Sequence, residues 1–473
     1  MAAIRKITLY VIVKQFIITV QYIEKTRIFA VRFSYNMMDL KIDFTDREIT
    51  PWAGISLMLK MLDKISINDV ISSLNLPQQG SNRGYSPEQL IMQFWISVWC
   101  GANCFDHLEV TRSDKVIQEM CRWKRMAGRK SFQRYFSKFS QAANQEVFTQ
   151  LYQWFFDSLK FDNYTLDFDS TVLTRYGEQE GAAKGYNAHK PGRNSHHPLL
   201  AFVSDCRMIA NCWLRPGNTG AATNFLPFLE DTLTKLRNKK VGLIRCDSGF
   251  FSGEIFDYLE SKGINYIVAA RFVRPIKLRM AHCRTWWTLD GGLQIGETTY
   301  QAEAWEEPRR LVMVRQEIKK RPKAAGKQLR LFPDDGTYLN YRYSCYTTNM
   351  ALPAKAIYDL YRGRADCENR IKEIKYDFGA GSFCMKKFWA TETALNFIAM
   401  AYNLMGLFRQ AVLQSKDKQN FLKTIRYSTF AIGGYVIRDG NSKILKLSMA
   451  MRRREWFKGL WNQSNNVSLP LIL

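Results

Sequence analysis

The chain has 473 residues, more than one hydrophobic core usually serves, so we expect two or three packed units and exclude a small disulfide-stapled module. Its 68 Lys and Arg against 43 Asp and Glu give a formal net charge of +25, while 46% of the residues are hydrophobic. A chain of this composition can fold, so disorder is a poor explanation, and the excess positive charge predicts a polyanionic partner, with nucleic acid as the first candidate. The ten scattered cysteines favour free thiols in a reducing compartment.

Residues 1–45 are predicted to be an N-terminal extension. The apolar run Ile7–Val13 follows two basic residues and resembles a signal peptide, but Lys14 and Gln15 interrupt it. The run is also too polar for a membrane span, so we expect a cytoplasmic protein without a membrane partner. Whether residues 1–36 belong to the functional protein stays open.

Residues 46–155 are predicted to form a helical DNA-binding domain, because apolar residues recur there at helical spacing. Near its end, a Gly-containing turn precedes a short helix with aromatic residues on one side and basic residues on the other. Such a helix resembles the second helix of a helix-turn-helix, whose polar side chains reach phosphates and base edges. The candidate DNA contacts are Arg129, Lys130 and Arg134, and a solvated helix face is the alternative.

Residues 160–270 are predicted to be the first part of an α/β catalytic core, because strands and helices alternate from about residue 164. On the first strand, Asp167 and Asp169 share one face while Leu166 and Phe168 point into the core. Two neighbouring carboxylates repel unless a cation intervenes, and a divalent metal is the natural one. Asp247 follows the apolar strand Val241–Cys246, where functional groups of open α/β sheets collect. Aspartates that only end strands or cap turns are the structural alternative.

Residues 271–350 are predicted to be a mostly β insertion, residues 351–415 the second part of the core, and residues 416–473 a C-terminal basic region. The insertion includes a basic loop at residues 319–330, and Trp286, Trp287 and Trp305. A helix is predicted from Pro353 to Lys375, although Gly363 weakens it. Within about 60° of its circumference it carries Tyr361, Arg364, Glu368 and Lys375, whereas Asp366 and Glu373 point away.

These motifs resemble the DDE transposases of bacterial insertion sequences, in the branch whose ribonuclease H-like core carries a β insertion before its final Glu. The spacing of Tyr361, Arg364, Glu368 and Lys375 matches that branch's Tyr-Arg-Glu-Lys signature without a gap. Asp169-Ser-Thr and Asp247-Ser-Gly-Phe match its two aspartate motifs, and residues 177–187 and 197–200 are also similar. The resemblance covers about residues 50 to 415.

The resemblance implies an α/β fold, a ribonuclease H-like core interrupted by the β insertion and preceded by the helical domain. It implies that Asp169, Asp247 and Glu368 are catalytic and bind two Mg²⁺ ions, with Mn²⁺ as the alternative metal, while Asp167 stays a rival for the first position. Tyr361, Arg364 and Lys375 would hold phosphates near the cleaved end, and a tryptophan of the insertion would stack a displaced base.

The implied activity is metal-dependent cleavage at the ends of the insertion sequence, followed by joining of the 3′-hydroxyl ends to target DNA in the bacterial cytoplasm, at the nucleoid. Double-stranded DNA is the implied partner, and a homodimer is expected when the protein assembles on DNA. A nuclease without strand transfer and an inactive DNA-binding regulator are the alternatives. The end and target sequences, the cleavage route and the activity of this copy stay open.

Overall fold

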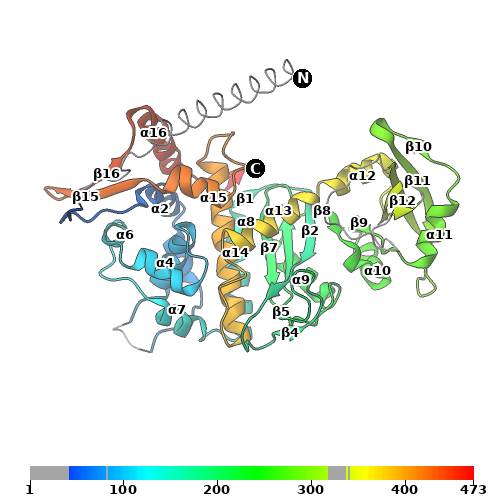
Figure 1. Ribbon diagram of the computed structural model, residues 1–473, viewed down its shortest axis with the longest axis horizontal. Coiled ribbons are helices and arrows are strands. Elements are labelled where there is room, and N and C mark those ends of the chain that lie inside the picture. Colours follow the sequence, from blue (N-terminus) through cyan, green and yellow to red (C-terminus); the bar gives the residue numbers. More distant parts are fainter. Residues whose placement is uncertain (1–41, 81–83, 318–336, 339–340, 473) are drawn as a thin grey trace, which may run out of the picture. The chain divides into compact units, whose positions relative to one another are not determined.

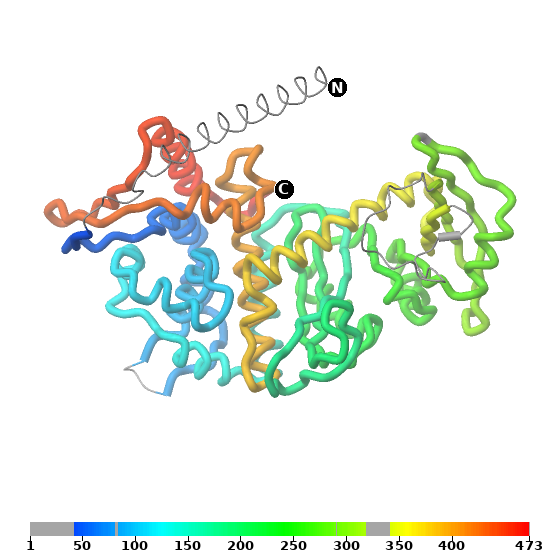
Figure 2. The backbone as a smooth tube through the Cα atoms, viewed as in Figure 1, coloured from blue at the N-terminus to red at the C-terminus, as the bar shows by residue number. Residues whose placement is uncertain are grey.

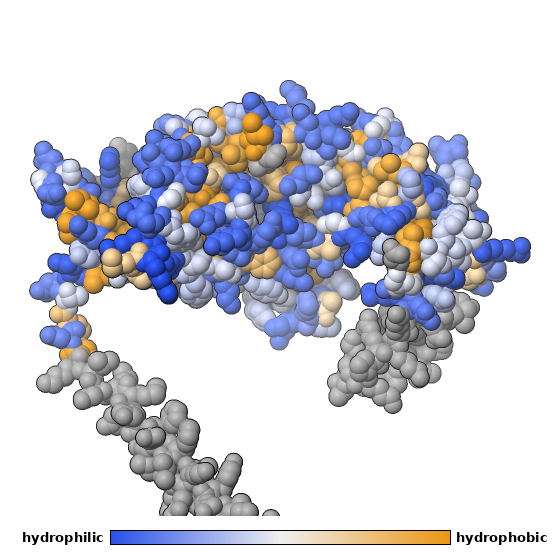
Figure 3. All heavy atoms as spheres, turned by 90° about the horizontal axis from the view of Figure 1, so that it is seen from above, coloured by the Kyte–Doolittle hydropathy of each residue, from blue (hydrophilic) through white to orange (hydrophobic). Residues whose placement is uncertain are grey.

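The computed structural model describes residues 42–80, 84–317, 337–338 and 341–472. The chain divides into two compact units, residues 1–47 and 48–473, and all elements below belong to the second. Most of the predicted N-terminal extension and the basic loop 319–330 lie outside the described residues. Within the described part, no helix has the length and apolarity that crossing a bilayer requires. On the face seen in Figure 3, hydrophilic side chains cover most of the surface and apolar ones form small separate groups.

The region before the first strands is helical, as predicted. Its helices are α2 Ser56–Lys64, α3 Ile67–Ser73, α4 Pro87–Trp99, α5 Glu109–Arg112, α6 Lys115–Met120, α7 Arg129–Phe136 and α8 Gln141–Asp157. Side-chain caps explain where several begin: the Ser86 hydroxyl accepts from the Gln89 N–H before α4, and the Ser140 hydroxyl accepts from the Ala143 N–H before α8.

A large mixed sheet forms the centre of the α/β region (Figure 1). In spatial order its strands are β10 Trp287–Thr288, β11 Leu293–Tyr300, β12 Arg309–Glu317, β14 Tyr341–Thr348, β9 Tyr266–Ala269, β8 Val241–Cys246, β2 Tyr164–Ser170, β6 Leu199–Val203 and β7 Met208–Trp213, and β13 Thr337–Tyr338 pairs with β14. β8 is parallel to β2 and to β9, and the other pairs are antiparallel. The chain is therefore a mixed α/β protein.

Helices α9 Phe225–Leu236, α10 Gly253–Ser261, α12 Ala354–Arg362, α13 Ala365–Tyr376 and α14 Phe388–Ala411 accompany this sheet. Phe168 of β2 packs against Phe225 and Phe228 of α9, with ring centroids 5.0 and 6.0 Å apart. On β7, the Asn403 amide of α14 both accepts from and donates to the Ile209 backbone at 2.8 Å. α14 thus satisfies polar groups of an edge strand that would otherwise attract another chain.

Helix α14 also joins the helical region to the sheet. It packs on α4, α7 and α8, and the Trp95 and Trp99 indoles of α4 donate to the carbonyls of Phe397 and Ala401 at 2.9 and 3.1 Å. The buried side chains of both regions therefore form one continuous core.

The region predicted to be a β insertion does not form a sheet of its own. Its strand β14 pairs with β9, so β10 to β14 extend the central sheet. Helix α11 Arg274–His282 was not predicted from the sequence. Its buried side chains are Ile276 and Met280, and one such pair is too short a pattern to reveal a helix.

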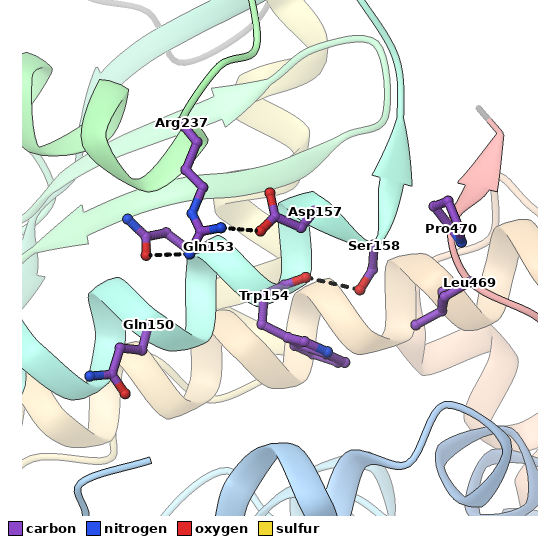
Figure 4. A pocket seen from close by; sticks show the side chains of 8 residues that line it. All are labelled: Gln150, Gln153, Trp154, Asp157, Ser158, Arg237, Leu469 and Pro470. Atoms are coloured by element: carbon purple, nitrogen blue, oxygen red, sulfur yellow. Dashed lines mark hydrogen bonds and ion pairs between the residues drawn. The ribbon is translucent and has the colours of Figure 1, made fainter. Parts of the chain in front are cut away.

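The C-terminal part packs on the helical region. It comprises α15 Leu422–Ile425, a π-helix Arg426–Phe430, the hairpin β15 Gly433–Asp439 and β16 Ser442–Ser448, α16 Met451–Asn465 and β17 Leu471–Ile472. β17 pairs in parallel with β1 Leu159–Lys160, and α16 packs on α2. Beside β1, residues of α8 and the segment leading into β17 line a cavity of about 450 Å³ (Figure 4).

Candidate active site

Asp169 lies near the end of β2 and is 8% exposed. Its Oδ1 accepts from the Ser170 N–H at 2.7 Å, and its Oδ2 lies 3.0 Å from Nη2 of Arg364. Burial raises the pKa of Asp169 to about 6; Arg364 lowers it, and the carboxylates of Asp247 and Glu368 raise it. Asp169 therefore senses the negative charge of both other predicted catalytic residues.

Asp247 follows β8 at the same edge of the sheet. β2 and β8 are parallel, with Phe168 opposite Cys246, so Asp169 and Asp247 are the next residues on neighbouring strands. The Asp247 Oδ1 accepts from the Gly249 N–H at 2.8 Å and caps a short 3-10 helix, Ser248–Phe250. Asp247 therefore follows the end of a strand, as the catalytic interpretation requires, and also caps a turn, as the structural alternative predicts.

Tyr361 lies on α12, Glu368 and Lys375 lie on α13, and Arg364 lies between the two helices. The helix predicted from Pro353 to Lys375 is therefore broken at Gly363 and Arg364, although its two parts continue in one general direction (Figure 2). The Tyr361 hydroxyl donates to the Cys246 carbonyl at 3.3 Å, and Arg364 donates to the Phe168 carbonyl at 3.3 Å. Lys375 Nζ donates to the Val172 carbonyl at 3.0 Å. Tyr361 and Arg364 thus contact the carbonyls that directly precede Asp247 and Asp169, and Lys375 contacts the backbone three residues beyond Asp169.

Glu368 lies between Arg364 and Lys375 along α13 and is exposed. The two other carboxylates of the helix are used elsewhere: Asp366 pairs with Arg207 at 2.9 Å and Arg370 at 3.1 Å, and Glu373 is fully buried against Arg409 and Arg370. The orientation predicted by the helical wheel is therefore confirmed for Asp366 and Glu373.

Asp167 is 2% exposed and lies one step deeper on β2. Its Oδ1 and Oδ2 accept from Nε and Nη2 of Arg245 at 2.6 and 2.7 Å. Both carboxylate oxygens are thus engaged by one guanidinium. Sequence reasoning missed Arg245, although an arginine inside the apolar run Val241–Cys246 is the signal that such a buried partner exists.

Across the described residues, no three His, Cys, Asp or Glu side chains stand close enough together to form a ready metal cluster. The donor set nevertheless suits hard divalent cations, because Asp169, Asp247 and Glu368 offer carboxylate oxygens whose charges act on one another. In this arrangement one oxygen of Asp169 is occupied by Arg364. The residues therefore fit a divalent metal chemically. In this structure the Arg364 guanidinium is the positive charge nearest to the Asp169 carboxylate.

A family model described as "Transposase DDE domain group 1" matches residues 34–467. The chain belongs to this family of DDE transposases. Among solved structures, it is similar to the piggyBac transposase in a synaptic complex with hairpin DNA, determined by cryo-EM, with a TM-score of 0.44 and 13% sequence identity over 82% of this chain and 83% of that one. No curated protein matches the chain. As a member of the family, the protein is a DNA transposase, and enzymes of this family use divalent metals.

Helix α7 of the transposase presents the predicted basic face. Phe132, Tyr135 and Phe136 are buried, while Lys130 and Arg134 are exposed. Arg129 forms an ion pair with Asp106. The preceding loop 121–128 is longer than the roughly three- to four-residue turn of a helix-turn-helix, so the comparison with that motif holds for the helix face and not for the turn.

The three tryptophans of the transposase's 271–350 region differ in exposure. Trp305 is 8% exposed and packs between Phe251 and Phe256, with ring centroids 5.4 and 5.5 Å away. Trp286 is partly buried, with the Arg315 guanidinium 4.2 Å from its ring. Trp287 is 53% exposed. Of these three side chains, Trp287 is therefore the one whose ring is most accessible to a ligand, whereas Trp286 and Trp305 pack against other side chains.

Proposed function

We propose that this transposase cleaves DNA at the ends of its own insertion sequence by metal-dependent phosphoryl transfer and joins the 3′-hydroxyl ends to target DNA. The observation that carries the proposal is the convergence of the strand-end aspartates and the signature helix face. Asp169 and Asp247 lie at the ends of neighbouring parallel strands. Arg364 pairs with Asp169, Lys375 contacts the backbone beyond it, and the Glu368 carboxylate raises the pKa of Asp169. Asp169 is favoured over Asp167 as the first ligand, because Asp167 is fully engaged by Arg245.

The sheet supports a ribonuclease H-like catalytic core. In the strand order β7-β6-β2-β8-β9, β6 is antiparallel to both neighbours while β2, β8 and β9 run parallel. We propose that residues 160–270 and 351–415 form this core, 271–350 its insertion, 46–155 the DNA-binding domain and 416–473 a basic C-terminal region. The free thiols of all ten cysteines suit action in the cytoplasm, where the bacterial nucleoid lies.

Asp169, Asp247 and Glu368 would hold Mg²⁺, or Mn²⁺ in its place. Bound there, the ions would supply the positive charge that activates a hydroxyl and stabilises a leaving oxygen during in-line attack at phosphorus. Glu368 is exposed and can approach this centre from the helix side.

The signature side chains would bind the phosphates beside the cleaved bond. Arg364 offers paired donors and Lys375 a point charge. Burial raises the pKa of Tyr361, so its phenol stays a neutral hydrogen-bond donor. Because Arg364 contacts Asp169 here, we propose that its guanidinium turns to phosphate when DNA enters.

Arg129, Lys130 and Arg134 are proposed to contact the element ends, and two chains are proposed to act as a homodimer on DNA. Lys130 and Arg134 are exposed, which leaves them free to neutralise phosphates.

The test uses Mg²⁺-dependent cleavage and strand transfer on duplexes taken from the DNA flanking the coding sequence. Asp169→Asn, Asp247→Asn and Glu368→Gln should each lower both reactions at least about 100-fold while DNA binding is retained. The control Glu307→Gln removes an exposed carboxylate outside the site and should keep full activity. Cleavage without joining would identify a nuclease, and binding without either reaction an inactive regulator.

A further inference from the structure

β2 continues beyond its aspartates into a small sheet of β3 Leu173–Thr174, β5 Asn194–His196 and β4 Ala183–Lys184. A groove with a volume of about 450 Å³ lies along this sheet. Its charged and aromatic lining consists of Arg175, Tyr176, Glu178, Lys184 and Arg193, and we call it the Arg175 groove. Arg175 follows Asp169 by six positions, so the two Cα atoms lie at most about 22 Å apart even along a fully extended chain.

Arg175 is a buried cation without a carboxylate partner among the described residues. It is 3% exposed; its Nε donates to Nδ1 of His196 at 2.9 Å, and its Nη1 donates to the Gly381 carbonyl. Its Nη2 has no hydrogen-bond partner in the described chain. Burial lowers the pKa of Arg175.

His196 cannot neutralise Arg175. Its Nε2 bonds the Glu180 carbonyl at 2.9 Å and its Nδ1 accepts from Arg175, which corresponds to a neutral imidazole. Burial and the Arg175 charge lower the pKa of His196 to about 4, so this ring stays uncharged at neutral pH. A buried charge is tolerated when an anion pairs with it, and the groove is where an external anion would enter.

The rim of the groove carries an exposed aromatic ring beside a lysine. Tyr176 is 70% exposed, and Lys190 Nζ bonds its hydroxyl and lies 4.9 Å from its ring centroid. Buried Asn187 donates to Thr174 Oγ1 at 3.0 Å and accepts from the Lys190 N–H at 3.0 Å. This bond pair fixes the lysine-bearing loop to β3, so an exposed aromatic face and its cation are held in place.

The cavity of Figure 4 shows the opposite situation. Its cation, Arg237, donates to Asp157 at 2.7 Å and to the Gln153 side chain at 3.0 Å, as the dashed lines in Figure 4 show. That charge is already balanced within the protein, so the cavity needs no anion. In the Arg175 groove, three cations face the single carboxylate of Glu178.

We infer that the Arg175 groove binds the phosphate backbone of a DNA strand that runs past the cleaved position, an inference that rests on the proposed function. Lys184 and Arg193 contact phosphates, Tyr176 offers a stacking face to a base, and Arg175 supplies fixed positive charge beneath them. Glu178 at the rim repels phosphates and sets the side on which the strand passes. The strand belongs either to the element end or to the target.

The experiment measures DNA affinity against salt by fluorescence anisotropy in EDTA, with an element-end duplex, an unrelated target duplex and a single-stranded oligonucleotide as probes. Lys184→Gln combined with Arg193→Gln should reduce the slope of log K against log salt by about 1.8 on the duplex that uses the groove, since each phosphate contact contributes about 0.9. The matched control, Lys160→Gln with Lys240→Gln, removes two exposed cations at the other end of β2 and should keep the wild-type slope. Tyr176→Ala should weaken binding of the single strand several-fold.

A wild-type slope for the Lys184 and Arg193 variant on all three probes would overturn the inference. An effect on the element-end duplex alone assigns the strand to the element, and an effect on the target duplex alone assigns it to the target. If wild type binds and cleaves while this variant keeps its slope, the groove assignment fails and the proposed function stands. If wild type binds none of the probes, both fail.

Discussion

Asp167 and Arg245 form a buried bidentate ion pair that connects two strands of the sheet to the signature helices. Arg245 donates to both carboxylate oxygens of Asp167, and its Nη1 also reaches the Leu360 carbonyl near the end of α12. The pair therefore fixes the junction from which Tyr361 and Arg364 reach the strand ends. Asp167 supports the site in this way without offering a free oxygen to it.

Exchanging Asp167 and Asp169 separately for Asn should give opposite results. Asp167→Asn leaves the buried Arg245 charge unpaired and should lower the free energy of unfolding by about 3–5 kcal/mol. Asp169→Asn also removes the carboxylate nearest to Arg364, but burial and two neighbouring carboxylates already disfavour the charged form of Asp169, so it should destabilise less than Asp167→Asn. It should nevertheless abolish cleavage. Urea unfolding and Mg²⁺-dependent cleavage check both. Wild-type stability in Asp167→Asn would refute the structural role.

Gly363 should resist replacement although its backbone is helical, with φ −56° and ψ −23°. An added Cβ would lie 2.6 Å from Arg245 Nη1, which is held by its contacts and cannot move aside. Gly363→Ala should therefore destabilise by about 1–3 kcal/mol. Gly459→Ala in α16 is the matched control: its Cβ meets nothing, so it should stabilise by about 0.5–1 kcal/mol. Urea unfolding measures the free energy of unfolding of both variants. A higher value for Gly363→Ala than for wild type would contradict the close packing of Gly363 against Arg245.

Glu373 and Glu368 lie on the same helix and should have opposite roles. Glu373 Oε1 accepts from Arg409 and from the Leu422 N–H at 2.7 Å, and it is fully buried. Glu373→Gln should cost about 3–5 kcal/mol of unfolding free energy because Arg409 loses its anion. Glu368→Gln changes an exposed side chain and should stay within about 0.5 kcal/mol of wild type. Equal stability losses in the two variants would show that the helix is oriented differently.

Replacing Trp305 should lower stability, whereas replacing Trp287 should affect DNA binding alone. Trp305→Ala opens a cavity among Phe251, Phe256 and Tyr300 and should cost about 3–5 kcal/mol. Trp287→Ala should leave the urea midpoint unchanged and, if Trp287 stacks a base, weaken binding of a probe with an unpaired base by about 1–3 kcal/mol. The corresponding Trp287→Phe variant should keep most of this binding. Unchanged affinity in Trp287→Ala would exclude the stacking role.

Local periodicity explains what could be predicted from the sequence. A period of two placed Asp167 and Asp169 on one face of β2, and the helical period separated Glu368 from Glu373 on α13. The partner of Asp167 could not be predicted, because it depends on which strands become neighbours. Arg245 approaches Gly363 closely, and Asn403 of α14 bonds the backbone of β7; neither contact is encoded within one segment. The features that could not be predicted from the sequence therefore depend on contacts between residues that are far apart in the chain.

Glu392 of α14 should make stability depend on pH. It is 7% exposed; its Oε1 accepts from the Leu214 N–H at 3.1 Å and its Oε2 from the Asn144 side chain at 3.2 Å. Burial raises its pKa from 4.5 to about 7; Asp231 also raises the pKa, and Lys235 lowers it. Between these two pKa values the folded chain holds a proton that the unfolded chain has released. The stabilising contribution is therefore complete below about pH 4.5 and is lost as the pH rises to about 7.

Glu392→Gln removes this titration and keeps an oxygen for the Leu214 N–H. Relative to wild type, the variant should gain roughly 2–3 kcal/mol of unfolding free energy between about pH 5 and pH 8, since each pKa unit corresponds to about 1.4 kcal/mol. Urea unfolding of both proteins at the two pH values measures this difference. Because only the change with pH is compared, the loss of hydrogen bonding to Asn144 cancels. A difference that is the same at both pH values would mean that Glu392 is ionised throughout, and that its two hydrogen bonds outweigh the cost of burial.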